Sequence, residues 1–350
     1  MNTMNLHNNP LAAEQYNMLL SRGLSPEHAA RAVELSFSPS SVHIDSALST
    51  LAMMIRNRDM IADAVMPVLQ VSKPSDKFFK YDAATAFEEQ NAQLTGAEAA
   101  PGRVRYQISN DNFSCVDYGL MDFVSNKEME SADAPIQPQA HAVKVVTQRL
   151  DIAKERRVAA IVFGSSNYGS NTAALSGSDR WDTSTSNPVQ KIDDAIEACN
   201  ARPNVMVIGA QAWVKLKNHP KFNEIILSRA ATANGATPER VTAAMVASCF
   251  ELDAVYIGRA KYMNNAEGAT NVPAYIWGKS CALIRVSDEP SMRETECFAK
   301  QFRFGTRATQ IIDAPIPGLS GGVYVKVTES LDEKVIAGEH AGYLFTTVVS

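Results

Sequence analysis

The feature that most constrains this chain is an uninterrupted stretch of about 26 residues, 138–163, rich in good helix formers and free of glycine and internal proline. Apolar residues recur in it at three- and four-residue steps and predict one apolar stripe: Val143, Val146, Leu150, Ala153 and Ile161. Charged residues fill the remaining positions: Lys144, Arg149, Asp151, Lys154, Glu155 and Arg156. Pro138 suits a first turn and Gly164 a stop, so the sequence predicts a single helix roughly 39 Å long.

Length and composition place the chain among ordinary packed proteins. Its 350 residues suffice for two domains, or for one domain with long extensions, and it is 45% hydrophobic and 20% charged. The formal net charge of −5 argues against a dedicated nucleic-acid binder, because such proteins carry a basic face. The cysteines are widely spaced without a C-x-x-C pair, which predicts reduced, mostly buried thiols in a cytosolic setting: Cys115, Cys199, Cys249, Cys281 and Cys297.

No stretch is typical of a membrane span or a secretion signal. A span needs about 18 apolar residues in a row, and no such run occurs. The first residues lack a basic start followed by an apolar core. We therefore expect no membrane partner.

The first third of the chain predicts two extensions. Residues 1–65 have helical patterns, near Ser25 and at 45–60, but too little apolar material for a core of their own. Residues 66–118 contain strand-like runs, including a strict apolar–polar alternation at 103–109, around about twenty polar residues. We predict an arm followed by a long hairpin-like loop. A two-stranded ribbon is marginal in water, so this loop needs a surface to lie on.

Residues 185–317 predict a compact α/β unit with short buried strands at 205–209, 254–258, 274–278 and 281–286. Further along, strands at 323–327 and 334–337, joined by a turn at 329–333, predict a β-hairpin. A third strand is expected at 343–349, and the long helix is the candidate surface for all three.

Three features suggest chemistry, and each has a plainer structural explanation. Gly209 stands between a strand and a helix, but Gln211 and Val214 occupy the remaining positions of a G-x-G-x-x-G motif. His340 has no nucleophile-elbow motif to serve and fits a surface turn. One helix face lacks metal-ligand spacing and is expected to be solvated: Asp193, Asp194 and Glu197. We predict no catalytic residue, no cofactor and no metal.

Three stretches, taken in their order and spacing, carry a resemblance to a known family. They are Val68–Asp82 with its Lys77-Phe78-Phe79; residues 203–209, leading through Trp213 and Leu216 to His219-Pro220; and Val335-Ile336-Ala337, followed by Ala341-Gly342-Tyr343. This order of parts resembles the major capsid proteins of tailed bacteriophages, which have the Hong Kong 97-type shell fold.

The resemblance implies an α+β fold of the Hong Kong 97-like type. Its parts would be an N-terminal arm (1–65), an extended β-hairpin loop (66–118), a peripheral domain (119–184 and 318–350) with spine helix 138–163, and an α/β axial domain (185–317). The turn near Ser330 would face a threefold junction. The residues expected to contact other subunits are Lys77, Phe78, Phe79, Lys80, Arg103, Arg105, Tyr106, Asp332 and Lys334.

The function implied is that of a non-enzymatic major capsid protein, self-assembling into the icosahedral shell around the double-stranded DNA genome of a tailed phage. Implied partners are its own copies in pentamers and hexamers, a separate scaffolding protein, a portal, a decoration protein and non-specifically contacted DNA. Assembly would occur in the host cytoplasm, with the protein residing in the virion. We expect no cleavage of the arm and no cross-linking through Lys77 or Lys80. Three alternatives stay open: a soluble α/β enzyme with its site near Gly209, a cellular nanocompartment shell protein, and a tube-forming tail protein.

Overall fold

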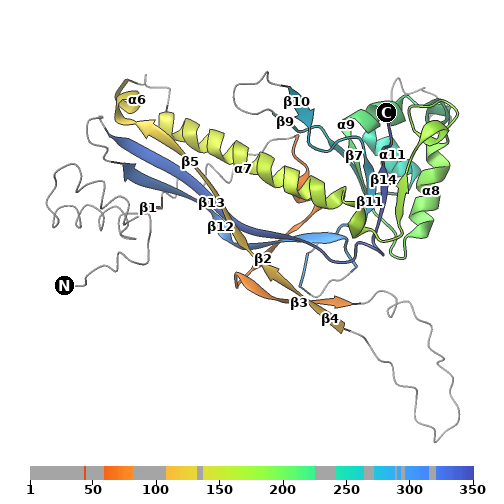
Figure 1. The fold of residues 1–350 in the computed structure, drawn as a ribbon, viewed down its shortest axis with the longest axis horizontal. Coiled ribbons are helices and arrows are strands. Elements are labelled where there is room, and N and C mark those ends of the chain that lie inside the picture. The colour runs from red at the N-terminus through yellow and green to blue at the C-terminus, as the bar shows by residue number, and fades with distance from the viewer. Residues whose placement is uncertain are drawn as a thin grey trace, which may run out of the picture. The chain divides into compact units, whose positions relative to one another are not determined.

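The computed structural model describes residues 43–44, 59–81, 108–131, 137–224, 241–263, 272–287, 290–292, 296–314 and 321–350. The chain divides into two compact units, one of residues 1–55, 119–148 and 307–328 and a larger one of residues 56–118, 149–306 and 329–350. Four long elements, drawn in Figure 1, contribute residues to both units: β5 (Val116–Ser125), α7 (Pro138–Val162), β12 (Ala299–Ala314) and β13 (Gly322–Val335).

The larger unit is built on a mixed five-stranded sheet. In spatial order its strands are β6 (Thr172–Ala174), β14 (Gly342–Thr346), β11 (Cys281–Ile284), β7 (Val205–Gly209) and β8 (Ala254–Gly258). β11 runs antiparallel to both β14 and β7, whereas β6 pairs with β14 and β8 with β7 in parallel. The strands predicted at 205–209 and 254–258 are confirmed.

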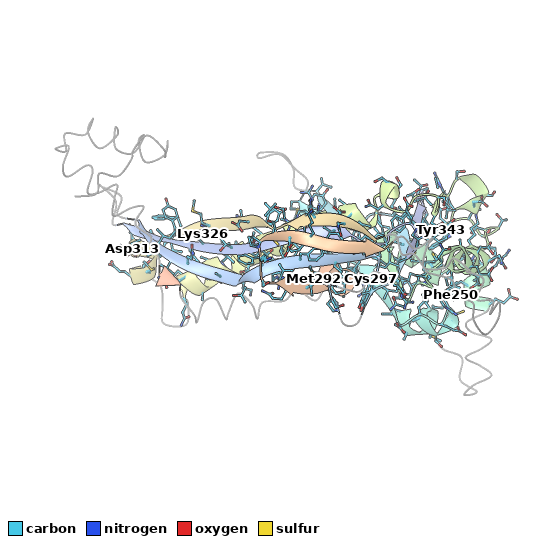
Figure 2. The ribbon with its side chains drawn as sticks, turned by 90° about the horizontal axis from the view of Figure 1, so that it is seen from below. Phe250, Met292, Cys297, Asp313, Lys326 and Tyr343 are labelled. Atoms are coloured by element: carbon cyan, nitrogen blue, oxygen red, sulfur yellow. The ribbon has the colours of Figure 1, made fainter. Side chains whose placement is uncertain are left out.

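Helices cover both faces of this sheet. One face packs against α8 (Pro188–Ala198), α9 (Ala210–Lys217) and α11 (Ala243–Cys249). The core on this face includes Phe250, and the partly buried Tyr343 packs against the same core; both residues are labelled in Figure 2. The other face packs against the second half of α7, where Val158 and Val162 join a core with Val207. Because both faces are buried, β7 and β11 are apolar throughout, as the sequence shows.

The predicted long helix is confirmed as α7, but the prediction of which side chains are buried and which are exposed is partly wrong. The charged residues Asp151, Lys154 and Glu155 are buried, whereas Ala153 of the predicted apolar stripe is exposed. The helix buries charged side chains because other segments supply partners for them, which helical periodicity cannot reveal.

The predicted hairpin-like extension is present as a two-stranded antiparallel ribbon. β3 (Ser75–Tyr81) pairs with β4 (Ile108–Ser114), in register from Ser75 opposite Ser114 to Tyr81 opposite Ile108. The strand expected at 103–109 therefore extends further along the chain, and residues 103–107 lie outside the described ranges. Before the ribbon come a short helix, α4 (Ala62–Val65), and β2 (Val68–Val71), which runs parallel to β12.

The predicted turn at 329–333 is wrong, because β13 continues through it as one strand. Its burial alternates without a break at Val325, Val327, Glu329 and Leu331, so one face of the strand stays covered. Ser330 accordingly lies within a strand and forms no turn toward a threefold junction. The third expected strand exists as β14, but it belongs to the sheet of β7 and β11 rather than to that of β13.

The smaller unit contains the short strand β1 (His43–Ile44), which pairs antiparallel with β12, and helix α6 (Asn126–Ser131). The helix predicted near Ser25 lies outside the described ranges, and so does the one predicted at 45–60 except for its last two residues, which are not helical. Within the described part of the chain, no helix is long and apolar enough to cross a membrane. The strand predicted at 281–286 is confirmed as β11, but the buried strand predicted at 274–278 is wrong: β10 (Pro273–Tyr275) ends earlier and pairs with β9 (Lys261–Met263) in a short hairpin outside the central sheet.

Candidate assembly surfaces

The base of the β3–β4 ribbon is fastened to its own subunit by three aromatic rings. Phe302 on β12 lies between Phe78 and Phe113, with ring centroids 5.3 Å and 4.6 Å away. All three rings are buried, and Cys297, labelled in Figure 2, and Ile336 join their cluster. The ribbon therefore has a fixed root.

Hydrogen bonds add to this root. The Ser114 amide donates to Asp332 Oδ2 at 2.7 Å, and the Cys115 amide donates to the Pro74 carbonyl at 2.8 Å. Lys334 Nζ lies 3.7 Å from the same Asp332 oxygen. Burial, with the nearby charge of Asp332, raises the pKa of the Cys115 thiol, which keeps this half-buried sulfur protonated. All five cysteines are free, as predicted.

The residues predicted to contact other subunits fall into three groups. Phe78 is buried in its own subunit, while Lys77 beside it is exposed. Asp332 and Lys334 lie at the ribbon's root. The rest lie outside the described ranges or have side chains that are not described: Phe79, Lys80, Arg103, Arg105 and Tyr106. Contact with other subunits stays a prediction for all three groups.

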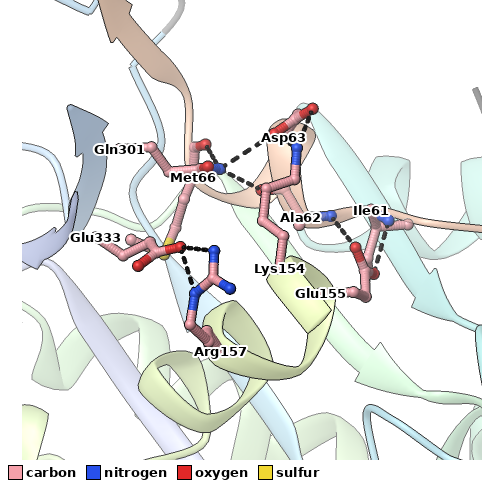
Figure 3. Close-up of polar contacts among 9 residues, drawn as sticks. All are labelled: Ile61, Ala62, Asp63, Met66, Lys154, Glu155, Arg157, Gln301 and Glu333. Carbon is pink, nitrogen blue, oxygen red and sulfur yellow. Dashed lines mark hydrogen bonds and ion pairs between the residues drawn. The ribbon is translucent and has the colours of Figure 1, made fainter. Parts of the chain in front are cut away.

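A second anchor joins residues 61–66 to the body of the larger unit through Glu155, shown in Figure 3. This buried carboxylate accepts hydrogen bonds from the Ile61 amide (2.8 Å), the Ala62 amide (2.9 Å) and the Trp277 indole (2.6 Å). The first two bonds satisfy amides at the start of α4, which no side chain of α4 itself caps. Burial raises the pKa of Glu155, and the three hydrogen bonds oppose that shift.

Charged and amide groups extend this anchor on both sides. Lys154 Nζ lies 2.9 Å from Asp63 Oδ1, and Gln301 Nε2 donates to the Met66 carbonyl at 2.7 Å (Figure 3). On the other side, Arg157 pairs with Glu333 at 2.9 Å, and its guanidinium stacks over the ring of Tyr118. One turn of α7 thus binds the segment before β2 and strand β13 together.

Asp63 makes the anchor sensitive to acid. Partial burial raises its pKa, but the charge and hydrogen bond of Lys154 outweigh this effect, so the pKa lies below its ordinary value of 3.8. A lowered pKa in the folded state contributes stability above pH 3.8 that is lost as the pH falls through the folded value. We expect the difference in free energy of unfolding between dissociated wild-type subunits and Asp63→Asn to shrink as the pH falls below 3.8. Urea unfolding from pH 7 to pH 3 measures it, with exposed Asp117→Asn as the control. A difference that does not change with pH would contradict this role for Asp63.

The backbone at Gly209 is packed too closely to accept a side chain. A Cβ there would collide with the Gly278 carbonyl oxygen, and a Cβ on Gly258, on the next strand, would collide with the Trp277 ring. The two glycines therefore allow close packing of β7 and β8 against residues 277–278. Among the described residues, no group of three or more His, Cys, Asp or Glu could hold a metal ion.

Two exposed features were not identified from the sequence. Strand β5 ends its sheet, yet it exposes Leu120, Met121 (63%) and Phe123. Exposed apolar side chains on an edge strand are typical of a surface that other chains cover. The second feature is the β9–β10 hairpin, where Arg156 stacks over Tyr262 at 4.4 Å. The sequence does contain a signal for the exposed surface of β5. The run Gly119–Phe123 has apolar residues at adjacent positions as well as alternate ones, so a strand there would carry apolar side chains on both faces.

The arrangement of these elements matches solved structures of phage-related and phage capsid proteins. A phage-related protein from Bordetella bronchiseptica RB50 superimposes with a TM-score of 0.66 at 23% identity, covering 87% of this chain and 97% of that chain. The capsid protein of cyanophage P-SCSP1u superimposes with a TM-score of 0.51 at 11% identity, over 82% of this chain and 87% of its own. The fold is therefore the Hong Kong 97-type capsid fold, as the sequence predicted.

Sequence comparison gives the family. No protein-family model matches the chain. The major capsid protein of Pseudomonas phage JBD67, however, is 31% identical over 310 residues, which cover 88% of this chain and 97% of that relative. This chain belongs to the family of phage major capsid proteins, and it is a structural protein of the virion.

Proposed function

We propose that the chain is the main subunit of an icosahedral shell that encloses the double-stranded DNA genome of a tailed phage. The observation that carries the proposal is the likeness to the JBD67 capsid protein along nearly the whole of both chains. In such a shell, contacts of modest strength are repeated many times, and their combined effect greatly exceeds that of any one contact. The protein would act by association, without enzymatic activity.

The β3–β4 ribbon supports an interlocking role. Its base is fastened by Phe302, whereas Lys77 and Asn112, which pair within the base, and Asn110, beyond the base, are exposed. An isolated two-stranded ribbon is marginally stable in water, so a neighbouring subunit is the natural support for its outer part. We propose that the ribbon lies on an adjacent copy, with Lys77, Phe79, Lys80, Arg103, Arg105 and Tyr106 among its contacts and Asp332 and Lys334 at its root.

The remaining assignments are proposals of the same kind. Residues 1–65 would form the arm, 66–118 the extended loop, 119–184 and 318–350 the peripheral domain, and 185–317 the axial domain. Sheet membership favours two changes to these bounds. β12 would move to the peripheral domain, because it pairs in the sheet of β13, and β14 would move to the axial domain, because it lies in the sheet of β7. Assembly would occur in the host cytoplasm through pentamers and hexamers. A scaffolding protein, a portal and a decoration protein would be its partners, with packaged DNA touched non-specifically.

A cellular nanocompartment shell is the second candidate, because the same fold serves such shells. The identity to a phage capsid protein favours the phage assignment. The enzyme alternative loses its motivating feature, because close packing against residues 277–278 explains why position 209 is a glycine.

Electron microscopy of the purified protein, alongside size-exclusion chromatography, tests the proposal. We expect closed particles, or rings of five and six subunits, from the wild-type chain. Deletion of residues 90–100, within the predicted loop, should leave a folded subunit that forms few or no stable shells, because the interlocking contacts are lost. A far-ultraviolet circular dichroism spectrum like that of the wild type is the control for folding. Normal particles from the deletion would rule out the interlocking role, whereas a wild-type chain that forms only monomers or dimers would rule out the shell function.

A further inference from the structure

Helix α8 presents an acidic face to solvent. Its inward side chains, Ile192 and Ala195, are buried against the sheet. The exposed side carries the acidic face, which consists of Asp193, Asp194 and Glu197. The lysine of this helix, Lys191, is engaged elsewhere, 3.0 Å from Asp179. Asp194 accepts a hydrogen bond at 2.8 Å from Gln190, whose neutral side chain leaves the negative charge of this carboxylate in place.

Helix α9 and the residues after it present an oppositely charged surface. Trp213 and Leu216 are buried, while Val214 is 46% exposed between them. The basic face consists of Lys215, Lys217 and Lys221, of which the first and last are exposed and the second is half-buried. Glu224 is the acidic side chain that follows along the chain. Among the described residues, no carboxylate lies within ion-pair distance of these three lysines or joins them to the acidic face.

The two faces lie at different places over one sheet. α8 packs against β14, and α9 packs against β7 and β8, on the far side of the central strand β11. Both helices cover the same side of the sheet. Two complementary surfaces at separate positions suit a head-to-tail contact between identical copies, and such a contact generates a ring when the rotation closes.

We propose that the acidic face of one subunit docks on the basic face of the next subunit in a ring, with Asp194 and Glu197 opposite Lys215 and Lys221. This inference rests on the proposed shell function and names the surfaces that join neighbours within a ring. Val214 lies within the basic face, where it loses contact with water on docking. The charges select the neighbour and its orientation, because placing like charges together is repulsive.

The strength of the contact depends on salt. Each exposed ion pair contributes modestly in water, and the effect of several pairs is repeated at every subunit of a ring. The screening length falls from about 10 Å at 0.1 M salt to about 3 Å at 1 M. The charge-dependent part of ring assembly therefore weakens over this range.

Charge reversal with rescue tests the contact. The variants are Asp194→Lys/Glu197→Lys, Lys215→Glu/Lys221→Glu, and the combination of all four substitutions. At 0.1 M NaCl each double variant is expected to lower the fraction of chain in rings and shells by about tenfold, since two attractive pairs become repulsive. The quadruple variant should return to within about threefold of wild type. Lys215→Arg/Lys221→Arg keeps the charges and should assemble like wild type.

Each result decides the matter once the unassembled variants are shown to keep the wild-type circular dichroism spectrum. Rings from both double variants at wild-type levels would overturn the inference, and so would a quadruple variant that stays as defective as its parents. Neither result contradicts the proposed shell function, which would be contradicted only if the wild-type chain itself formed no rings or shells.

Discussion

Replacing Glu155 by alanine is expected to destabilise the dissociated subunit by about 3 kcal/mol. The substitution leaves three donors without their acceptor: the amides of Ile61 and Ala62 and the indole of Trp277. A buried donor without a partner costs about 1–3 kcal/mol, and release of the carboxylate from its own burial offsets part of the sum. Urea unfolding at pH 7, followed by circular dichroism, measures the change.

Two further variants give this prediction its controls. Glu155→Gln retains one acceptor oxygen, which can still serve two donors, so its loss should be about half as large. Glu197→Ala removes an exposed carboxylate and should change the free energy of unfolding by less than about 0.5 kcal/mol. A Glu155→Ala subunit as stable as the Glu197→Ala subunit would show that the segment at 61–66 does not depend on this anchor.

Replacing Phe302 by alanine is expected to cost about 3–5 kcal/mol and to release the root of the β3–β4 ribbon. The ring is fully buried and contacts Phe78 and Phe113, so its removal opens a cavity between the ribbon and β12. We expect faster proteolysis of residues 72–115 and failure to form stable shells. Limited proteolysis and electron microscopy measure the two effects.

The matched control stands two residues away on the same strand. Phe304 is 38% exposed, so Phe304→Ala should cost less than about 1 kcal/mol and leave the ribbon protected. Equal protease sensitivity of the Phe302→Ala and wild-type ribbons would refute the assignment of Phe302 as the root.

The sequence predicts the elements whose signals are local. Pro138 and Gly164 bracket α7, and the observed helix, Pro138–Val162, ends within two residues of the second. The apolar run at 205–209 predicts a buried strand, and every residue of β7 is buried. Such signals depend on neighbours a few positions away, so they do not require the tertiary structure.

Features that depend on distant partners could not be predicted in this way. Glu155 is charged and helical, which favours an exposed position, yet it is buried because donors at 61, 62 and 277 converge on it. The run 329–333, polar except for Leu331, is typical of a turn, but pairing with other strands keeps it extended. The root of the ribbon likewise joins Phe78 to Phe302, more than two hundred positions further along the chain.

The position of β14 has a consequence for synthesis of the protein. This strand lies between β6 and β11, and its residues Leu344 and Phe345 belong to the cores on opposite faces of the sheet. β6 pairs with β14, so it has no place in the sheet until residues 342–346 leave the ribosome. A nascent chain shorter than this exposes an unpaired edge of β11 and parts of both apolar faces. Synthesis of residues 342–346 thus determines when this sheet can be completed, and chains terminated before residue 342 lack the strand that joins β6 to β11.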